Sequence, residues 1–525
     1  MKASLAATAC VLALTTFCAS AFGADYYVSP QGDDGNPGGK DKPFKTIAKA
    51  AAVAGPGAVI RIQAGTYPER VAPANSGTAE APITIQKEGP GEVIWTAPEA
   101  APAKGMGAAL NLDGKAHFVV DGITFKDCTC WITMGEANHV TVKNCTFDGS
   151  RIYNSLWVNN GSFIRIVNCD FKRARPYVTD EKGVSTNKTA ADFIEFFRNS
   201  HHNLVEGCRF GEIGHVAVSF SAFRKGFRPH HNIIRNCTFT DPMWKCLGVH
   251  AEDTLVENCT MSGKAAVFFQ FESARTIVRR NLFHGFRSSL PDKEDVYRGA
   301  IRLGSTDDGG SEYFMFRDNR VYHNLFTDND RTITSYAARN PIDDNVFKNN
   351  IFFGNRMTLW LCQPDYKTKS KTCFVNNVLC GMKPGEKILG YETKQFTLAE
   401  AQKDLAELYQ GNVESDPQFA DAAKKDFHLK DGSPCIDAGA NLTATSADGS
   451  GKVVPVEDAL YFCDGFGIID GDLIVVGQNK PVKVTKVDSE KKTLEVDREI
   501  AWKKGDAVNQ PFSGKAPDIG PLEKQ

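Results

Sequence analysis

Short runs of alternating apolar and polar residues recur along most of the chain in one shared frame. Residues 140–147 (Val-Thr-Val-Lys-Asn-Cys-Thr-Phe) and 164–171 (Ile-Arg-Ile-Val-Asn-Cys-Asp-Phe) show it most clearly, with Cys or Asn at a fixed point of each run. Alternation with a period of two predicts a short strand that has one apolar face. The residues at the fixed point are Cys145, Cys169, Cys208, Cys237, Cys259, Asn281, Asn319, Asn350 and Asn377.

The spacing of these runs predicts the fold class. The shortest spacing, from Cys237 to Cys259, is 22 residues, which corresponds to one coil of a parallel β-helix. Longer spacings then represent coils that carry inserted loops. One strand cannot bury its apolar face alone, but stacked coils bury it in a continuous core. We therefore predict an all-β chain, a parallel β-helix whose regular coils occupy residues 110–380.

The cysteines at the fixed point have a structural interpretation. Asn at a bend between two strands can hydrogen-bond to the backbone of the next coil and form a ladder. Cys is a small, often buried side chain that fills the same position. We interpret the five cysteines as part of the core rather than as a redox centre, with disulfides between neighbouring coils as the alternative.

The chain divides into four predicted parts. Residues 1–23 combine a positive charge, a short apolar run and small residues, which is typical of a cleavable signal peptide and predicts a secreted or periplasmic protein. Residues 24–440 form the parallel β-helix. Residues 441–516 contain short alternating runs that predict a small β-barrel-like insertion, either structural or sugar-binding. Residues 517–525 return to the β-helix as its exit segment.

Helices are predicted near both ends of the coil stack. Residues 43–54 place apolar side chains on one face, and a helix there would cover the unpaired strand edges at the open end. Thr397 and Glu400 fit a capping box, which predicts a helix that continues to Tyr409. These helices are the exceptions in a chain that otherwise predicts strands and turns.

Composition excludes several classes of protein. The chain has 525 residues, 42% of them hydrophobic and 24% charged, so it can bury a large core and is not disordered. The net charge of −2 argues against a strongly basic nucleic-acid-binding protein. After residue 23 no run is apolar enough to predict a membrane span. The sequence leaves the oligomeric state open.

Both ends of the predicted β-helix resemble a known group. The entrance reads Tyr-Tyr-Val-Ser-Pro-Gln-Gly at 26–32 and Ile-Arg-Ile-Gln-Ala-Gly-Thr-Tyr at 60–67, and the exit reads Gly-Ser-Pro-Cys-Ile-Asp-Ala-Gly at 432–439. These segments look like those of secreted right-handed parallel β-helix proteins of the pectate-lyase superfamily. The resemblance implies that the β-helix is right-handed and that the partner is a polysaccharide. That group includes polysaccharide lyases and glycoside hydrolases, so the resemblance leaves the reaction open.

A polar column is predicted from the repeat frame. Nine residues before the fixed point stand Glu136, Asn160, Asn199, His250 and Glu272. If the turns have equal lengths, His250 and Glu272 lie on adjacent coils, where a His beside a carboxylate forms a workable acid–base pair. We expect these groove side chains to be exposed. Solvated turn residues are the alternative, because turns are polar in any case.

Further candidates lie in the same region. Glu195 is a carboxylate among apolar strand residues, which indicates either projection into a groove or a salt bridge at a turn. Arg302 is an equivalent strand cation that can hold a carboxylate or sulfate. Lys245 is a candidate base or substrate ligand, and Asn199 and Gln270 are candidate substrate ligands. Candidate groove loops lie at 173–190, 223–231, 288–299 and 305–312.

Charge near these residues favours an acidic polysaccharide. Residues 201–305 contain 14 Lys and Arg against 10 Asp and Glu, although a surplus of four is also compatible with scatter. A polysaccharide lyase is our first hypothesis, a glycoside hydrolase with paired carboxylates the second, and a non-catalytic glycan-binding protein the third. No metal ligand is assigned. Calcium is the one cofactor considered, at Asp307–Asp308 or at Asp328 and Asp330, neither of which has EF-hand spacing.

Overall fold

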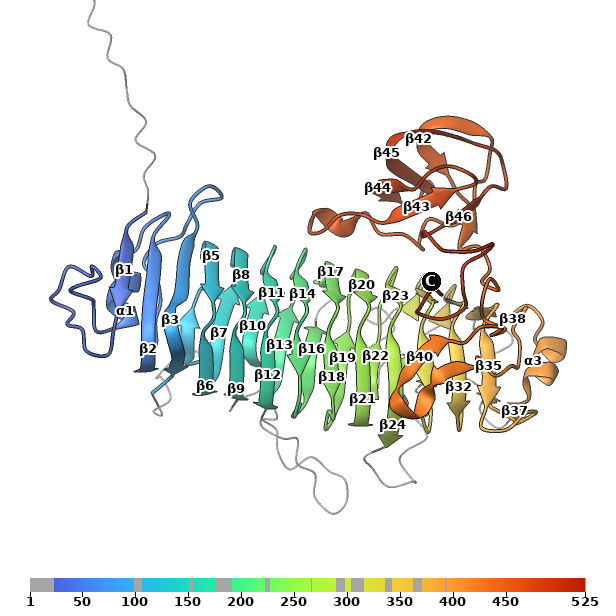
Figure 1. Cartoon of the computed structure of the whole chain (residues 1–525), viewed down its shortest axis with the longest axis horizontal. Coiled ribbons are helices and arrows are strands. Elements are labelled where there is room, and N and C mark those ends of the chain that lie inside the picture. Colours follow the sequence, from blue (N-terminus) through green and yellow to red (C-terminus); the bar gives the residue numbers. More distant parts are fainter. Residues whose placement is uncertain are drawn as a thin grey trace, which may run out of the picture.

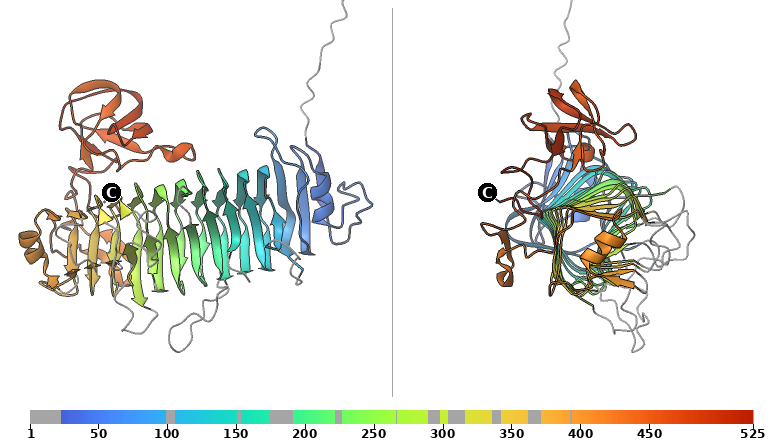
Figure 2. Two further views of the ribbon diagram at one scale, coloured as in Figure 1. Left: turned by 180° about the vertical axis from the view of Figure 1, so that it is seen from behind. Right: turned by 90° about the vertical axis from the view of Figure 1, so that its right-hand side faces the viewer.

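The protein is a right-handed parallel β-helix with a small β-subdomain near its C-terminus (Figure 1). The computed structural model describes residues 23–98, 106–150, 154–174, 191–221, 227–265, 267–288, 298–303, 316–335, 342–361, 371–391 and 394–524. The predicted signal peptide, apart from residue 23, and most of the predicted groove loops lie outside these residues. Strands stack along one long axis, and the view down that axis shows the coils superimposed (Figure 2).

Each coil contributes up to three strands, and equivalent strands pair in parallel from coil to coil. The first set begins with β1 (Asp25–Val28), β2 (Val59–Pro68) and β3 (Ile83–Thr96). It continues with β5 (Ala116–Asp121), β8 (Asn138–Lys143), β11 (Arg165–Val167), β14 (Leu204–Glu206), β17 (His230–Arg235), β20 (Glu252–Glu257), β23 (Ile277–Arg279), β27 (Arg320–Tyr322), β31 (Val346–Lys348), β34 (Cys373–Val375) and β38 (Tyr409–Gln410).

The second set follows the bend that carries the repeated Cys or Asn. It comprises β6 (Thr124–Cys128), β9 (Thr146–Ser150), β12 (Asp170–Ala174), β15 (Arg209–Phe210), β18 (Thr238–Thr240), β21 (Thr260–Ala265), β24 (Leu282–Ser288), β28 (Leu325–Thr327), β32 (Ile351–Asn355) and β35 (Val378–Gly381). Two short strands, β26 (Phe316–Arg317) and β30 (Ile342–Asp343), pair separately.

The third set forms a separate twelve-stranded sheet. Its strands are β4 (Ala108–Asn111), β7 (Cys130–Gly135), β10 (Asn154–Asn159), β13 (Asp192–Phe197), β16 (Val216–Ser221), β19 (Lys245–Val249), β22 (Val267–Phe271), β25 (Ile301–Leu303), β29 (Ile333–Ser335), β33 (Leu359–Leu361), β36 (Leu389–Tyr391) and β37 (Lys394–Phe396). All neighbours pair in parallel except β36 and β37, which are antiparallel.

Like residues stack in columns inside the coils. Phe125, Phe147, Phe171, Phe210 and Phe239 form a continuous stack with ring centroids 4.7–5.2 Å apart. This spacing matches the distance between neighbouring strands, so each ring packs on the ring of the next coil. This stack and the stacked pairs Phe196–Phe220, Phe283–Phe326 and Phe347–Phe374 place many of the 34 Phe residues of the chain in the core.

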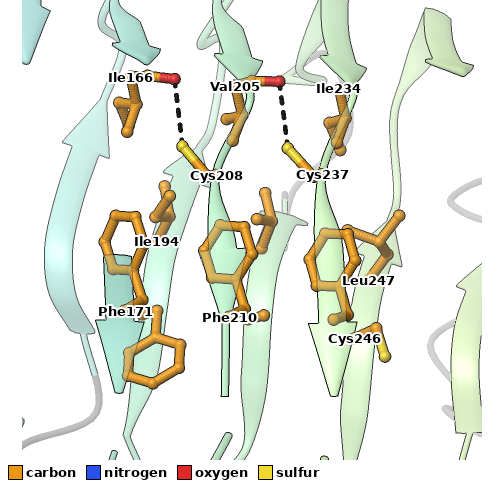
Figure 3. Close-up of a cluster of buried hydrophobic side chains, with 14 of the residues drawn as sticks. Ile166, Phe171, Ile194, Val205, Cys208, Phe210, Ile234, Cys237, Cys246 and Leu247 are labelled. Atoms are coloured by element: carbon orange, nitrogen blue, oxygen red, sulfur yellow. Dashed lines mark hydrogen bonds between the residues drawn. The ribbon is translucent and has the colours of Figure 1, made fainter. Parts of the chain in front are cut away.

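The five repeated cysteines point inward and are buried, as predicted. Their thiols contact backbone carbonyls of the preceding coil: the Sγ of Cys208 lies 3.5 Å from the Ile166 oxygen, and the Sγ of Cys237 lies 3.7 Å from the Val205 oxygen (Figure 3). All five are free thiols. The column is therefore structural, and the disulfide alternative is wrong.

Asparagine replaces cysteine in the later coils of this column, with one correction to the predicted frame. The Asn281 side-chain amide donates to the Oδ1 of Asn324, and the Asn324 amide donates to the Oδ1 of Asn350, at 3.0 and 2.9 Å. Asn324, not Asn319, therefore holds the predicted position. Asn319 belongs to another ladder at the preceding bend, where its amide donates to the Oδ1 of Asn345 at 2.8 Å.

Helices lie near both ends of the coil stack (Figure 1). The first, α1 (Ile47–Val53), starts at Thr46, whose hydroxyl caps the helix, and it buries Ile47, Ala50 and Ala51. The second, α3 (Leu398–Asp404), begins with the predicted capping box but ends before the predicted Tyr409. Tyr409 instead lies in β38, where its hydroxyl contacts that of Tyr391 at 2.7 Å. None of the helices in the described residues has the length and apolar character that crossing a membrane requires.

The exit of the β-helix contains the hairpin β39 (Phe419–Asp421) and β40 (Asp426–Leu429), with the 3₁₀ turn Ala422–Lys424 between them. The C-terminal subdomain follows as a six-stranded antiparallel sheet (Figure 2). Its strands are β41 (Thr443–Ala444), β42 (Gly449–Pro455), β43 (Leu473–Val476), β44 (Val482–Asp488), β45 (Thr493–Trp502) and β46 (Ala507–Asn509), and a 3₁₀ turn occupies Gly465–Gly467.

A buried ion pair fastens this subdomain to the coils. The guanidinium of Arg279 lies 2.6 Å from the Asp472 carboxylate of the subdomain and 2.7 Å from the Glu257 carboxylate of the neighbouring coil. The hydroxyl of Tyr322 donates to the backbone oxygen of Tyr461 at 2.7 Å. These contacts, with apolar residues from both parts in one cluster, fix the subdomain on the β-helix.

Candidate functional site

The outer face of the twelve-stranded sheet carries one continuous row of mostly polar residues. Within β13, Ile194 and Phe196 belong to the core, so Glu195 between them faces outward. Strand register places equivalent residues of successive coils side by side, about 4.8 Å apart. We call this set the polar row: Thr133, Trp157, Glu195, Ser219, Gly248, Gln270, Arg302, Thr334 and Trp360.

The polar row is more buried than the sequence suggested. Exposed fractions are 4% for Glu195, 3% for Gln270 and 6% for Arg302, and Glu272 is 1% exposed. The expectation that the groove side chains are exposed is therefore wrong for these four. Buried charges cost free energy unless they are paired, and they concentrate at functional sites. Their burial also strengthens electrostatic interactions with anything that binds there.

His250 and Glu272 lie on adjacent coils, as predicted. The Nδ1 of His250 is 2.8 Å from the Oε2 of Glu272, and the amide of Gln270 donates to the other carboxylate oxygen. Burial alone would raise the pKa of Glu272, but the charge and hydrogen bond of His250, the Gln270 amide and nearby Lys245 outweigh it and lower that pKa. Glu272 is therefore ionised and fixes the orientation of the His250 ring.

Glu195 has the opposite character. The hydroxyl of Ser221 donates to its Oε1 at 2.6 Å. Burial, assisted by the negative charge of Asp192, raises the pKa of Glu195 to about 7, although the Ser221 hydrogen bond acts against this shift. A carboxyl group that titrates near neutral pH can both give and take a proton.

Glu195 and the His250–Glu272 pair form one cluster. Phe220 pairs with Val249, and Val249 pairs with Phe271. The residues that follow these three, Ser221, His250 and Glu272, therefore lie side by side on consecutive coils. Since Ser221 holds the Glu195 carboxyl, that group lies about one strand spacing from the His250 coil. We call Glu195, Ser221, His250 and Glu272 the acid–base cluster.

The predicted cations border this cluster. Arg302 neighbours Gln270 in the polar row, and Lys245 begins β19 and acts electrostatically on Glu272. Asn199 is placed elsewhere. Phe197 pairs with Ser221 and so occupies the column position, while Asn199 lies two residues later in an exposed turn, where its backbone N–H donates to Asn160 at 3.3 Å.

The structure adds a second His–carboxylate pair that sequence reasoning missed. Nδ1 of His215 lies 2.6 Å from the Oδ1 of buried Asp192, which also accepts the Val216 backbone N–H at 3.1 Å. The His215 ring stacks on Trp244, and the Arg298 guanidinium lies 5.0 Å from the Trp244 ring centroid. Asp192 is the first residue of β13, the strand that also contains Glu195. Like Glu195, it is a carboxylate beside apolar strand residues, and this pattern was the sequence signal that could have identified it.

The calcium candidates receive no support from the described residues. Both Asp328 and Asp330 lie within ion-pair distance of Arg287, at 2.6 and 3.9 Å. Asp307 and Asp308 lie outside the described residues. Among those residues, no group of three or more His, Cys, Asp or Glu side chains is arranged to hold a metal ion.

Comparison with known proteins agrees with this fold. The model of the right-handed β-helix region matches residues 108–241 and 226–382, which together span more than half of the chain. The chain belongs to the right-handed β-helix family. An uncharacterized protein, YwoF of Bacillus subtilis, is 31% identical over 130 residues, which cover 23% of this chain and only 28% of that protein.

Several solved structures are similar to this chain at low identity. A rhamnogalacturonan lyase is 18% identical with a TM-score of 0.40, covering 68% of this chain and 87% of its own. A family PL6 alginate lyase, AlyGC, is 15% identical with a TM-score of 0.44, covering 81% and 61%. A lacto-N-biosidase from Eubacterium ramulus is 13% identical with a TM-score of 0.43, covering 70% and 68%.

Proposed function

We propose that the outer face of the twelve-stranded sheet binds an acidic polysaccharide and that the acid–base cluster cleaves it by β-elimination. The observation that carries this proposal is the adjacency of two differently tuned groups. Glu195 has a pKa of about 7, whereas the neighbouring pair places a His250 ring against an ionised carboxylate. Environments that separate the ionisation of neighbouring groups are characteristic of acid–base catalysis.

Each residue has a defined role in this proposal. With Nδ1–H donated to Glu272, the Nε2 of His250 is the base that removes the proton next to a uronate carboxylate. The C–H electrons form the new C=C bond, the glycosidic C–O bond breaks, and protonated Glu195 gives its proton to the leaving oxygen. Arg302 or Lys245 neutralises the uronate carboxylate, which makes the abstracted proton more acidic.

Hydrolysis by paired carboxylates fits the geometry less well. A hydrolase of that kind needs two carboxyl groups that reach the glycosidic bond or its attacking water. The Glu272 side chain has no exposed surface, and its oxygens contact His250 and Gln270. Glu272 is therefore shielded from solvent, whereas the His250 side chain is 27% exposed and is the member of the pair that a substrate can reach.

The test is a screen of acidic and neutral glycans with the full-length protein processed as the cell produces it. A rise in ultraviolet absorbance from unsaturated chain ends on a uronate polymer supports β-elimination. Reducing ends that appear without that absorbance contradict it and indicate hydrolysis. Binding without any cleavage contradicts catalysis and indicates a glycan-binding protein. Secretion, the predicted location, is tested by N-terminal sequencing of the protein recovered from the growth medium or periplasm.

A further inference from the structure

Several buried polar atoms on the outer face of the twelve-stranded sheet have no hydrogen-bond partner among the described residues. They include the Oγ1 of Thr133, the Oδ1 of Asn159 and the Oε1 of Gln270. Gln270 belongs to the surroundings of the acid–base cluster. Thr133 and Asn159 lie on the neighbouring strands β7 and β10, toward the N-terminal end of the sheet. An unsatisfied buried polar group is costly, so each one calls for a partner that the free protein lacks.

Trp157 neighbours both of these residues. It pairs with Thr133 on the neighbouring strand, and Asn159 follows it by two residues on the same face of β10. Unlike Thr133, which is 4% exposed, the Trp157 side chain is partly open to solvent. A partly exposed indole flanked by two unsatisfied polar atoms combines an apolar plate with hydrogen-bonding groups, which is how protein sites bind small polar ligands.

A sugar ring matches this combination. A pyranose has an apolar face of C–H groups that stacks on an indole, and hydroxyls at its edge that donate and accept hydrogen bonds. Thr133 can donate or accept, whereas Asn159 Oδ1 accepts. Neither residue is charged, so the arrangement selects hydroxyl groups rather than a carboxylate. The acidic groups of the ligand find their cation at Arg302, five coils from Trp157 and about 24 Å away at the usual strand spacing.

We infer that Thr133, Trp157 and Asn159 form a sugar-binding subsite next to the acid–base cluster. Trp157 pairs with Glu195 in strand register, so a sugar stacked on Trp157 lies one coil from the catalytic carboxyl. The subsite therefore holds a sugar near the cleaved bond and requires a chain rather than a single monosaccharide. This inference rests on the proposed function for the kind of ligand, but binding can be measured without turnover.

The test is a fluorescence titration of the full chain with hexasaccharides of polygalacturonate, alginate and hyaluronan. His250→Asn serves as the background so that no ligand is consumed. Replacing Trp157 by Ala should raise Kd for the bound hexasaccharide at least about tenfold, and Trp157→Phe, which keeps an aromatic plate, should change it much less.

Thr133→Val separates a binding role from a structural one. The variant keeps the shape of the side chain and removes a hydroxyl that has no partner, so the melting temperature should stay equal or rise while Kd increases about three- to tenfold. Thr276→Val is the matched control. Its Oγ1 is also buried and unpartnered, but it precedes β23 in the first set of strands, so its change should leave Kd unaltered.

The outcomes separate this inference from the proposed function. If the wild type binds a hexasaccharide but cleaves none, and Trp157→Ala weakens that binding, the proposed function fails and the subsite stands. If the Trp157→Ala enzyme cleaves with unchanged KM and Kd, the subsite fails and the function stands. A lower melting temperature in Thr133→Val with unchanged Kd overturns the subsite in favour of a structural role. Absence of binding by the wild type to all three probes contradicts both.

Discussion

The Nδ1 of His250 and the Oε2 of Glu272 lie 2.8 Å apart although 22 residues separate them in the sequence. One coil of the β-helix closes in those 22 residues, so the repeat itself brings the imidazole and the carboxylate together. The pair belongs to a cluster in which the pKa of Glu195 is raised to about 7, whereas the pKa of Glu272 is lowered and this carboxyl is ionised. Two carboxyl groups of the same kind therefore differ in charge at neutral pH because their surroundings differ.

Replacing Glu195 by Gln should stabilise the protein at alkaline pH. The raised pKa means that the folded protein binds this proton more tightly than the unfolded chain does. Stability is therefore lost as pH rises from about 4.5 through about 7, and the shift corresponds to about 3 kcal/mol above that range. Gln keeps an acceptor for Ser221 and lacks this loss.

Denaturant unfolding measures this effect. At pH 8 the Glu195→Gln variant should have the higher free energy of unfolding, and below pH 4 the two proteins should be alike. Glu523, whose pKa burial also raises to about 7, belongs to the exit segment and provides a comparison outside the site. If the Glu195→Gln variant is less stable than the wild type at pH 8, the claim that the ionised Glu195 carboxylate destabilises the folded protein is wrong.

His250→Asn and Glu272→Gln should each lower the cleavage rate at least about 100-fold. Asn has no base at the required position, and an amide in place of the Glu272 carboxylate no longer selects the His tautomer that presents Nε2. Since Glu272 is buried, its replacement should also cost roughly 1–3 kcal/mol of stability, whereas His250→Asn should cost less. The exposed pair of His428 and Asp426, at 2.6 Å, supplies the control: His428→Asn should leave the rate unchanged.

The columns of the core were accessible from the sequence, but the frame within the longer coils was not. Asn319 and Asn324 are five residues apart, and both belong to asparagine ladders, at two successive bends. The strands beside them have only two or three residues, so alternation there cannot distinguish the two frames. The strand register is defined by the three-dimensional structure, in which Leu325 pairs with Leu282.

The candidate site could be predicted from the sequence only where neighbouring coils have equal lengths. A constant offset from the fixed point found His250 and Glu272 because the two coils between Cys237 and Asn281 have equal length. The offset misplaced Asn199, whose coil is longer. Asp192 and His215 escaped because their partnership depends on the bend before β16, whose conformation no periodicity describes.

The buried cysteines should resist chemical labelling in the native protein. Cys145, Cys169, Cys208 and their column partners are all within the core, where burial makes the thiols inaccessible to a labelling reagent. Cys373, the one described cysteine that is not buried, is the internal control and should react first. Replacing Cys208 by Phe should overpack the column at a cost of about 1–3 kcal/mol. Rapid labelling of all five without denaturant would be incompatible with this column.

Attachment of the subdomain should depend on Asp472. Its removal leaves the buried charge of Arg279 with Glu257 alone, and breaking a buried pair in this way costs about 3–5 kcal/mol. Asp472→Ala should therefore lower the melting temperature and expose the subdomain to limited proteolysis. Asp470→Ala, which removes an exposed pair with Lys483, should do neither. Equal behaviour of the two variants would contradict the role of Arg279 as the fastening residue.

The most direct test of the acid–base cluster is the rate at which unsaturated ends form on an acidic polysaccharide, measured against pH. Protonated Glu195 is the required acid, so the wild-type rate should fall about tenfold per pH unit above about pH 7. In Glu195→Gln the rate should be at least about 100-fold lower and the alkaline fall should disappear. An alkaline limb that persists unchanged in Glu195→Gln, at wild-type rate, would place the chemistry elsewhere on the molecule.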